Sequence, residues 1–258
     1  MSTLTTELCE GNRNLAANPH TSRSNDADTL QEAAQSEPRV EHLIDWLTYT
    51  VPHNVGLHNA FFQHAALYNT GEVIRKMDPW NVRGYTRRLA LSHGTLNFHP
   101  ERPEQKICVQ FTGRDLYYLR NAGIDLRDLL QHALDHDAHI SRMDFAVDYY
   151  GPSSPLDLQE AFLAKELKSA AKRDVRFILG CDLYKGEITE TYSSYFGSNQ
   201  SRRMLRCYDK AYQVGVPGPW TRAELVMRDG YGNRVADAMV KDGVDAAGKQ
   251  AIREFIQC

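Results

Sequence analysis

Residues 142–150 read RMDFAVDYY, and this stretch decides the fold class. Side chains alternate across a β-strand, so Arg142, Asp144 and Asp148 fall on one face and the apolar residues between them fall on the other. At about 3.3 Å per residue the two carboxylates stand ~13 Å apart, too far to chelate one ion together. One of them is therefore a candidate metal ligand. The alternative is an exposed polar face with an Arg–Asp pair.

Further stretches rich in β-branched and aromatic residues predict more strands. The first stretch belongs to a predicted strand over 140–149, and the others are residues 43–51, 85–98 with a break at Gly94, 106–112, 192–197, 204–212 and 220–228. Leucines at helical spacing predict a helix behind Asp125, and a capping pattern at Ser154 predicts a second helix that runs to about Ala171. Several strands follow one another without a helix. We therefore expect an α+β fold with a largely antiparallel β-sheet and helices packed on one face.

The first 38 residues are rich in Ser, Thr, Asn, Ala and acids and lack apolar periodicity. Such a segment buries too little apolar surface to offset its ordering entropy, so we expect a disordered tail over 1–38 and a folded domain over 39–258. The sequence has no run of about 18 apolar residues and no signal-peptide pattern, which predicts a cytoplasmic protein without a membrane span. The cysteines are scattered without a CxxC pair, which argues against a disulfide framework.

The net charge of −3 at first disfavours a nucleic-acid partner, because Lys and Arg supply most of the affinity for phosphates. The first 40 residues, however, hold three of the 30 basic and six of the 33 acidic residues, so the remainder is neutral. Two basic clusters lie within it, one containing Arg87 and Arg88 and the other Arg202 and Arg203. These clusters are candidates for DNA phosphate contacts or, alternatively, solvated charged faces.

Residues 206–210 read RCYDK and fall in the predicted strand 204–212, so we expect Arg206, Tyr208 and Lys210 on one face. A tyrosine hydroxyl with an ordinary pKa near 10 is a poor nucleophile unless cations or a metal favour its phenolate. Arg206 and Lys210 are placed to do this. The alternative is a tyrosine that packs its ring and hydrogen-bonds its hydroxyl.

Carboxylates on three predicted strands suggest a metal site. Glu224 shares a strand face with Arg222, and Asp45 supplies another carboxylate near the start of the folded region. Mg²⁺ and Mn²⁺ prefer oxygen ligands, so strands that each supply one carboxylate can converge on such an ion. His132 and His136 stand four residues apart on a predicted helix, but no third ligand completes a recognised spacing, so we expect a surface role for them.

Five segments, taken in order, resemble the replication initiation factor family of rolling-circle plasmids, filamentous phages and related integrative elements. They read IDWL at 44–47, SRMDFAVD at 141–148, YFGS at 195–198, LRCYDK at 205–210 and WTRAEL at 220–225. The resemblance spans roughly residues 40–242. It implies metal-dependent nicking of one strand at an origin hairpin, a covalent 5′-phosphotyrosine and a 3′-hydroxyl retained as primer. A covalent intermediate keeps the phosphodiester energy for later rejoining.

The resemblance also implies residue roles. Tyr208 is the expected nucleophile, assisted by Arg206 and Lys210, with Tyr195 as the rival nucleophile. The expected ligands of Mg²⁺ or Mn²⁺ are Asp144 and Glu224, followed by Asp45 and Asp148. The DNA-binding candidates are Arg142, Arg222, Arg202, Arg203, Arg87 and Arg88, since guanidinium groups bind phosphates with bidentate geometry.

Partners and alternatives follow from the same resemblance. Origin DNA, as a hairpin or single-stranded nick site, is the expected partner, together with a host helicase and a second copy of the chain. The chain ends at Cys258 whereas many relatives continue, so a C-terminal truncation is part of the expectation. The main alternative is a non-cleaving DNA-binding regulator with the same fold, and a structural protein without a DNA role is a third.

Overall fold

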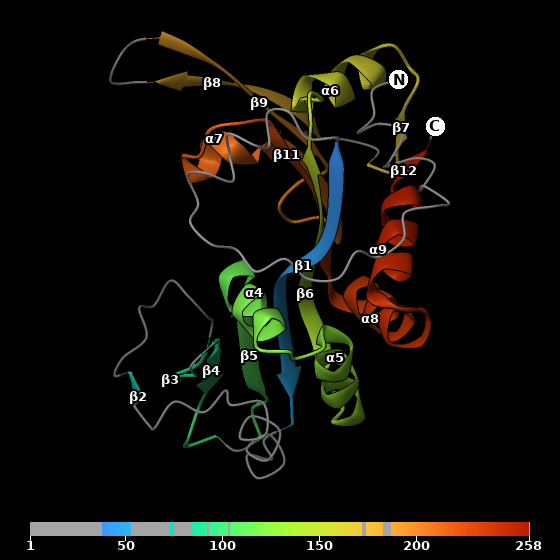
Figure 1. Ribbon diagram of the computed structural model, residues 1–258. Coiled ribbons are helices and arrows are strands. Elements are labelled where there is room, and N and C mark those ends of the chain that lie inside the picture. Colours follow the sequence, from blue (N-terminus) through green and yellow to red (C-terminus); the bar gives the residue numbers. More distant parts are fainter. Residues whose placement is uncertain are drawn as a thin grey trace. The chain divides into compact units, whose positions relative to one another are not determined.

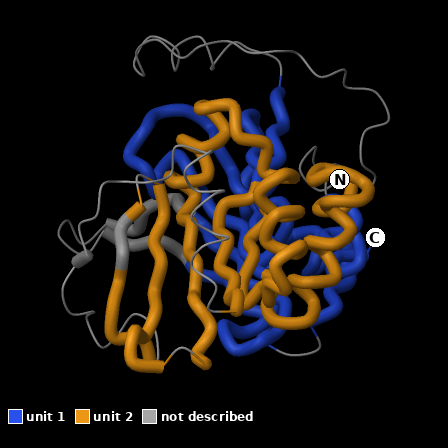
Figure 2. The backbone as a smooth tube through the Cα atoms, turned by 90° about the horizontal axis from the view of Figure 1, so that it is seen from below, with its two compact units in different colours: residues 1–43, 146–226, 249–258 blue, residues 44–145, 227–248 orange. Residues whose placement is uncertain are grey.

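The computed structural model describes residues 38–52, 73–74, 84–91, 93–102, 104–171, 174–182 and 187–257. Of the predicted tail only Pro38 is among them, so the prediction for residues 1–37 lies outside the described residues. The chain divides into two compact units (Figure 2). Unit 1 comprises residues 1–43, 146–226 and 249–258, and unit 2 comprises residues 44–145 and 227–248.

The described strands include a ten-stranded sheet in the order β2-β3-β4-β5-β1-β6-β11-β10-β9-β8 (Figure 1). Their bounds are β1 Arg39–Val51, β2 Val73–Ile74, β3 Arg87–Ala90, β4 Thr95–Phe98, β5 Ile107–Thr112, β6 His139–Tyr150, β8 Val175–Asp182, β9 Glu187–Phe196, β10 Arg203–Asp209 and β11 Trp220–Arg228. Pairing is antiparallel between β1 and β5, β3 and β4, β4 and β5, β8 and β9, and β9 and β10. The predicted α+β class with a largely antiparallel sheet is confirmed.

Unit 2 contains helices α4 Gly113–Asn121, α5 Leu126–Asp135 and α8 Asp229–Asp242. The predicted start of α5 is confirmed, because the Asp125 side chain accepts a hydrogen bond from the Arg127 amide at 2.8 Å. Leu126, Leu129 and Leu130 of α5 are buried, and the Arg127 guanidinium donates to the Val240 carbonyl of α8 at 2.6 Å. Tyr49 and Phe111 lie in the core of this unit, with ring centroids 6.5 Å apart.

Unit 1 contains helices α6 Pro155–Leu163 and α7 Lys210–Val214, and the short strands β7 Lys168–Ser169 and β12 Ile256–Gln257, which pair with each other. Helix α9 Val244–Arg253 runs across the boundary between the two units. Helix α6 packs on β9 and β10. Its Phe162 ring lies 5.2 Å from Phe196 and 6.2 Å from Phe177, which forms an aromatic core under the helix.

Two predictions about elements are wrong, and several elements were not predicted. The second predicted helix ends at Leu163 instead of continuing to Ala171, because the chain turns through Lys165 with φ of 63° and then forms β7. Strand β10 ends at Asp209, so Lys210 opens helix α7 and does not continue the strand. Strand β8 and helices α4, α8 and α9 have no counterpart among the predicted elements.

No helix among the described residues is long and apolar enough to cross a membrane.

Candidate active site around Tyr208

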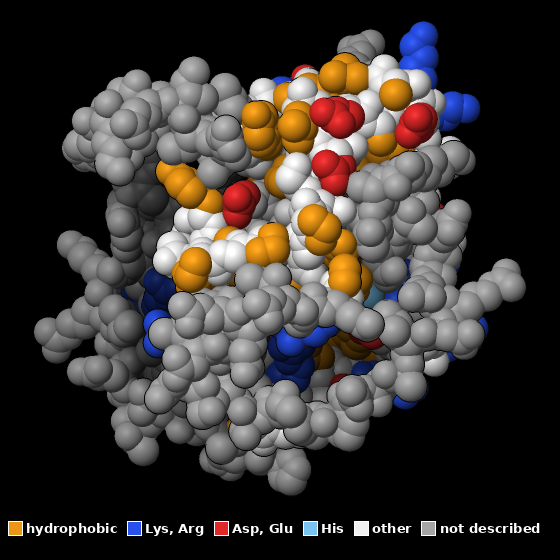
Figure 3. Space-filling model, turned by 45° about the horizontal axis from the view of Figure 1, so that its top comes forward, with side chains coloured by type: hydrophobic (Ala, Val, Ile, Leu, Met, Phe, Trp, Pro, Cys, Tyr) orange, Lys and Arg blue, Asp and Glu red, His pale blue; other side chains and the backbone are white. Residues whose placement is uncertain are grey.

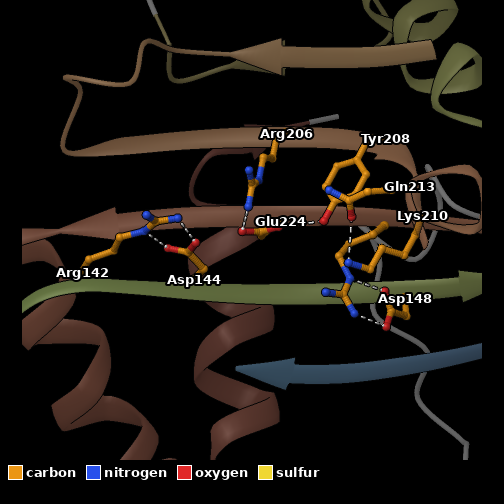
Figure 4. A network of polar contacts seen from close by, with 9 residues as sticks. Arg142, Asp144, Asp148, Arg206, Tyr208, Lys210, Gln213 and Glu224 are labelled. Carbon is orange, nitrogen blue, oxygen red and sulfur yellow. Dashed lines mark hydrogen bonds and ion pairs between the residues drawn. The ribbon is translucent and has the colours of Figure 1, made fainter. Parts of the chain in front are cut away.

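Strand β10 places Tyr208 and Arg206 on the same side. Alternation puts the fully buried Leu205 and Cys207 on the opposite face of the strand. Strand β11 is the neighbour of β10 in the sheet and carries Glu224. Figure 4 shows Arg206 and Tyr208 both directed toward Glu224. Two adjacent strands of unit 1 therefore assemble a tyrosine, a carboxylate and a guanidinium.

Tyr208 and Glu224 form a buried hydrogen bond. The Tyr208 hydroxyl donates to Oε2 of Glu224 at 3.1 Å. Glu224 is 0% exposed and Tyr208 is 8% exposed. A carboxylate buried this deeply needs partners, and the tyrosine hydroxyl is one of them.

Arg206 supplies the positive charge beside this pair. Its Nη2 forms an ion pair with Oε1 of Glu224, the carboxylate oxygen that Tyr208 does not use. Its guanidinium carbon lies 5.5 Å from the centroid of the Tyr208 ring, within range of a cation–π contact. The Arg206 side chain is 31% exposed, whereas the Glu224 carboxylate that it binds is fully buried.

Lys210 reaches Tyr208 from a helix. The Asp209 side chain accepts a hydrogen bond from the Tyr212 amide at 2.8 Å and so caps α7. Lys210 Nζ lies 5.8 Å from the Tyr208 ring centroid and donates to Oε1 of Gln213 at 2.8 Å. The predicted strand position of Lys210 is wrong, yet its ammonium lies near the tyrosine. Gln213 was missed, because its role depends on this unpredicted helical turn.

Asp148 and Arg222 form a second buried pair in unit 1. Arg222 Nε and Nη2 donate to the two carboxylate oxygens of Asp148 at 2.6 and 2.7 Å. The side chains are only 3% and 5% exposed. Arg222 was predicted to contact DNA phosphates and Asp148 to bind metal. In the structure the two side chains bind each other. This pairing depends on β6 and β11 being neighbours in the sheet, and the sequence alone does not reveal that order.

In unit 2, Asp144 is paired with Arg142 on the same strand. Arg142 Nε donates to Oδ1 of Asp144 at 2.9 Å, and Nη2 forms an ion pair with Oδ2. The Arg142 guanidinium also lies 4.7 Å from the ring centroid of Trp46 on β1. Asp144 is 1% exposed, so the charged face of β6 is buried instead of open. The Arg–Asp pair considered as the alternative for this strand is present.

Asp45 lies against the start of α4. A Cβ atom added to Gly113 would collide with the Asp45 carboxylate, so this close approach requires glycine. Asp45 and Asp144 belong to unit 2, and Asp148 and Glu224 belong to unit 1.

The four carboxylates do not assemble a metal site within the described residues. No group of three or more His, Cys, Asp or Glu side chains there could hold a metal ion. Asp144, Asp148 and Glu224 each accept an arginine, which occupies oxygens that a divalent cation would need. Lone ligands satisfied by guanidinium groups do not fit the expected Mg²⁺ or Mn²⁺. We therefore derive the chemistry of Tyr208 from protein side chains alone.

The rival tyrosine occupies the neighbouring strand. Tyr195 of β9 pairs in register with Arg206, and Tyr208 pairs with Ser193. Directly opposed residues share a face of the sheet, so Tyr195 and Tyr208 are diagonal neighbours on one face with Arg206 beside both. The Arg176 guanidinium lies 5.5 Å from the Tyr195 ring centroid. The two candidate nucleophiles therefore share a face of the sheet, and each has an arginine nearby. The hydrogen bond to Glu224 is the feature that favours Tyr208.

The remaining DNA-binding candidates lie on or directly before the strands β3 and β10. Arg202 is exposed beside β10, and the Arg203 guanidinium lies 5.5 Å from the ring centroid of Phe255. Arg87 on β3 is exposed and Arg88 is half-buried. Figure 3 shows acidic side chains over the upper part of one face, with Lys and Arg side chains beside them at the upper right and more of them lower down.

Comparisons with known proteins agree with this fold. Residues 138–257, which include β6, β10 and β11, match the family model described as replication initiation factor. A solved rolling circle replication initiator protein from Geobacillus stearothermophilus is 21% identical, with a TM-score of 0.71 over 85% of this chain and 86% of that chain. No curated protein matches this chain.

The chain thus has the fold of a rolling-circle replication initiator. The predicted resemblance to the replication initiation factor family is confirmed by the match over residues 138–257.

Proposed function

We propose that this protein initiates rolling-circle replication by nicking one DNA strand, with Tyr208 as the nucleophile. The observation that carries the proposal is the buried hydrogen bond from the Tyr208 hydroxyl to Glu224, with Arg206 on the other carboxylate oxygen. A carboxylate within hydrogen-bond reach of a nucleophile is placed to act as its general base. The family match and the shared fold support this class of reaction.

The step begins with proton transfer from the Tyr208 hydroxyl to Glu224. The phenolate oxygen then attacks the scissile phosphorus and forms a 5′-phosphotyrosine bond, while the bond from phosphorus to the 3′ oxygen breaks. The 3′ oxygen takes a proton from solvent and becomes the primer hydroxyl. Its later attack on the phosphotyrosine reverses these bonds and rejoins the strand.

The cations beside Tyr208 support both the proton transfer to Glu224 and the attack on phosphorus. The ion pair with Arg206 favours the ionised form of Glu224, which is the form that can accept a proton. The positive charges of Arg206 and Lys210 beside the tyrosine would stabilise negative charge that develops on the phosphoryl oxygens. In this proposal Arg222 supports the site through Asp148.

The expected divalent metal stays a prediction that belongs to this proposal. The direct test is Mn²⁺ titration followed by electron paramagnetic resonance, in the absence of DNA and in its presence. Saturable binding that disappears in Asp144→Asn or Glu224→Gln supports the predicted ligands, and the absence of binding in both states contradicts them.

The nicking proposal is tested with a supercoiled plasmid that carries the cognate origin. After incubation with Mg²⁺ or Mn²⁺, we expect relaxed DNA and a protein–DNA adduct that survives denaturation. Tyr208→Phe should abolish the adduct, and the matched variant Tyr195→Phe should form it. The opposite pattern would assign the nucleophile to Tyr195, and an adduct in both variants would exclude a unique role for either tyrosine.

A non-cleaving DNA-binding regulator is the second candidate. The observation in its favour is that the Tyr208 hydroxyl is already hydrogen-bonded and that three of the predicted metal ligands are each paired with an arginine. Tight origin binding without an adduct under any metal condition would select the regulator. Origin DNA is the partner in both cases. A host helicase, a homodimer and a cytoplasmic location stay predictions from the resemblance.

A further inference from the structure

Helix α4 in unit 2 turns an unusual set of side chains outward. Its inner face is fixed by Leu116 and Leu119, which are 2% and 1% exposed. The outward positions are exposed and hold two tyrosines, two arginines and an asparagine: Tyr117, Tyr118, Arg114, Arg120 and Asn121. Nothing in the proposed nicking chemistry uses this face.

The two tyrosines are exposed neighbours on the helix. Tyr117 is 37% exposed and Tyr118 is 40% exposed. Aromatic side chains stabilise a protein chiefly by burying their large apolar surface, so two exposed neighbours indicate a surface that binds something. Their ring centroids are 5.6 Å apart and the rings are inclined at 71°, so each ring offers surface in a different direction.

Neighbouring side chains hold Tyr118 in place. The His93 ring from the turn before β4 stacks on Tyr118, with centroids 5.0 Å apart and an interplanar angle of 19°. The Arg114 guanidinium lies 5.6 Å from the Tyr118 ring centroid. A ring fixed in this way loses little further conformational freedom when a flat ligand stacks beside it.

The charge of this face is positive. Arg114 and Arg120 point outward, and the helix contains a single acid, Asp115. The Asp115 carboxylate accepts hydrogen bonds from the Thr112 amide and hydroxyl at 2.8 and 2.7 Å, so it is committed to the helix cap. The next acid along the chain, Asp125, caps α5. The outward face of α4 therefore combines two exposed arginines with two exposed tyrosines.

We propose that the outward face of α4 is a base-stacking surface for single-stranded DNA. Bases stack on exposed aromatic rings without regard to sequence, and arginines beside the rings bind the phosphates. Duplex DNA hides its base faces within the stack, so rings at this surface favour an unpaired strand. The choice of DNA rests on the proposed function, which acts at a nick site and releases a single strand.

The test measures binding of a fluorescent 15-residue oligothymidylate to the full chain by anisotropy at fixed salt. Tyr117→Ala/Tyr118→Ala should weaken binding by about 5-fold to 100-fold, since stacking is lost from one or two bases. Tyr117→Phe/Tyr118→Phe keeps the ring faces and should bind within about twofold of the parent protein. Tyr231→Ala, which removes a tyrosine paired with Arg234 on α8, is the matched control and should change little.

Folding is checked by the urea midpoint of each variant. If the Ala variant unfolds, Arg114→Gln/Arg120→Gln replaces it, because these exposed arginines bind the phosphates in this proposal and their loss should also weaken oligothymidylate binding. Unchanged affinity in a folded Ala variant would overturn the proposal, as would an equal loss for duplex DNA of the same length. Tighter binding of oligouridylate than of oligothymidylate would overturn the assignment to DNA.

Failure of nicking is distinguishable from failure of this surface. Tyr208→Phe should lose the covalent adduct and keep oligothymidylate affinity. The α4 Ala variant should lose affinity and still form the adduct at saturating DNA.

Discussion

The Tyr208 hydroxyl donates to the Glu224 carboxylate over 3.1 Å, and both residues are buried on neighbouring strands of unit 1. Arg206 binds the second oxygen of the same carboxylate. The protonation of the tyrosine is therefore coupled to the charge of Glu224, and the charge of Glu224 is coupled to Arg206. This chain of contacts makes the proposed nucleophile sensitive to a substitution on a different strand.

Replacing Glu224 with Gln should slow adduct formation by about 10²-fold to 10⁴-fold, the usual contribution of a general base. The amide keeps the shape of the side chain but cannot take the tyrosine proton. The rate is measured by quenching time points of the reaction and quantifying the covalent adduct. Glu166→Gln makes the same chemical change at an exposed position of unit 1 and should leave the rate unaltered.

Measuring the rate at higher pH distinguishes a general-base role of Glu224 from a purely structural role. A variant that lacks only the base should regain part of its rate as more of the tyrosine ionises without help, toward its ordinary pKa near 10. A variant in which the site is structurally disturbed should not regain its rate at higher pH. An adduct rate equal to that of the parent protein at neutral pH would refute the role of Glu224.

The buried pair of Asp148 and Arg222 should contribute strongly to folding. Asp148→Asn leaves the buried guanidinium without this carboxylate and should lower the free energy of unfolding by about 3–5 kcal/mol. Glu41→Gln breaks the exposed pair with Arg39, with side chains 40% and 56% exposed, and should cost less than about 1 kcal/mol. Urea denaturation monitored by circular dichroism gives both values.

Removing both charges of the buried pair is the complementary experiment. Asp148→Leu combined with Arg222→Met replaces the pair with apolar side chains and should be less damaging than Asp148→Asn, since neither charge is then buried alone. A double variant that loses as much stability as the sum of its single variants would show that the two side chains are not coupled.

Local alternation was enough to predict the strands that carry the site. Strand β11 has the predicted bounds, and β6 extends only one residue beyond the prediction at each end. The shared face of Arg206 and Tyr208 also follows from alternation, because that property is decided within a single strand. The sequence could not predict which strands are neighbours. The Tyr208–Glu224 and Asp148–Arg222 contacts depend on that order.

Predictions failed where distant residues decide the local structure. Residues 168–169 pair with 256–257 in a small sheet, and this long-range contact replaces the helix that was expected to continue to Ala171. Lys210 was predicted on a strand because the pattern around it alternates. The Asp209 cap on the Tyr212 amide instead starts a helix. A strand pattern that ends in a capping residue is ambiguous at its last positions.

Glycines at helical positions give a test of packing. The ring of Phe145 fills the space where a Cβ atom of Gly248 in α9 would lie, whereas nothing lies within 4 Å of that position at Gly230 in α8. Gly248→Ala should therefore destabilise the protein by about 1–3 kcal/mol through overpacking. Gly230→Ala should be stabilising by up to about 1 kcal/mol, since alanine favours the helix. Urea midpoints that move in the same direction for both variants would contradict this packing.

The buried thiols of Cys108 and Cys207 should resist alkylation in the folded protein. Both are free and buried. Burial raises the pKa of Cys108 from 9.0 to about 11, against an opposing effect of the nearby Asn97 side chain. Burial also raises the pKa of Cys207, with a further contribution from the charge of Asp157. The reactive thiolate is therefore scarce at pH 8. Iodoacetamide should label both peptides only after urea is added, as read by mass spectrometry.

The same shift has a consequence for stability at alkaline pH. A thiol whose pKa is higher in the folded state contributes stability that is fully present below the unfolded pKa and is lost as pH rises through the folded value. For Cys108 the window runs from about pH 9 to pH 11. The urea midpoint should therefore fall across this range, and it should fall less in Cys108→Ala. An identical slope in that variant, or rapid labelling of Cys108 in the folded protein at pH 8, would show that the thiol is not held protonated by burial.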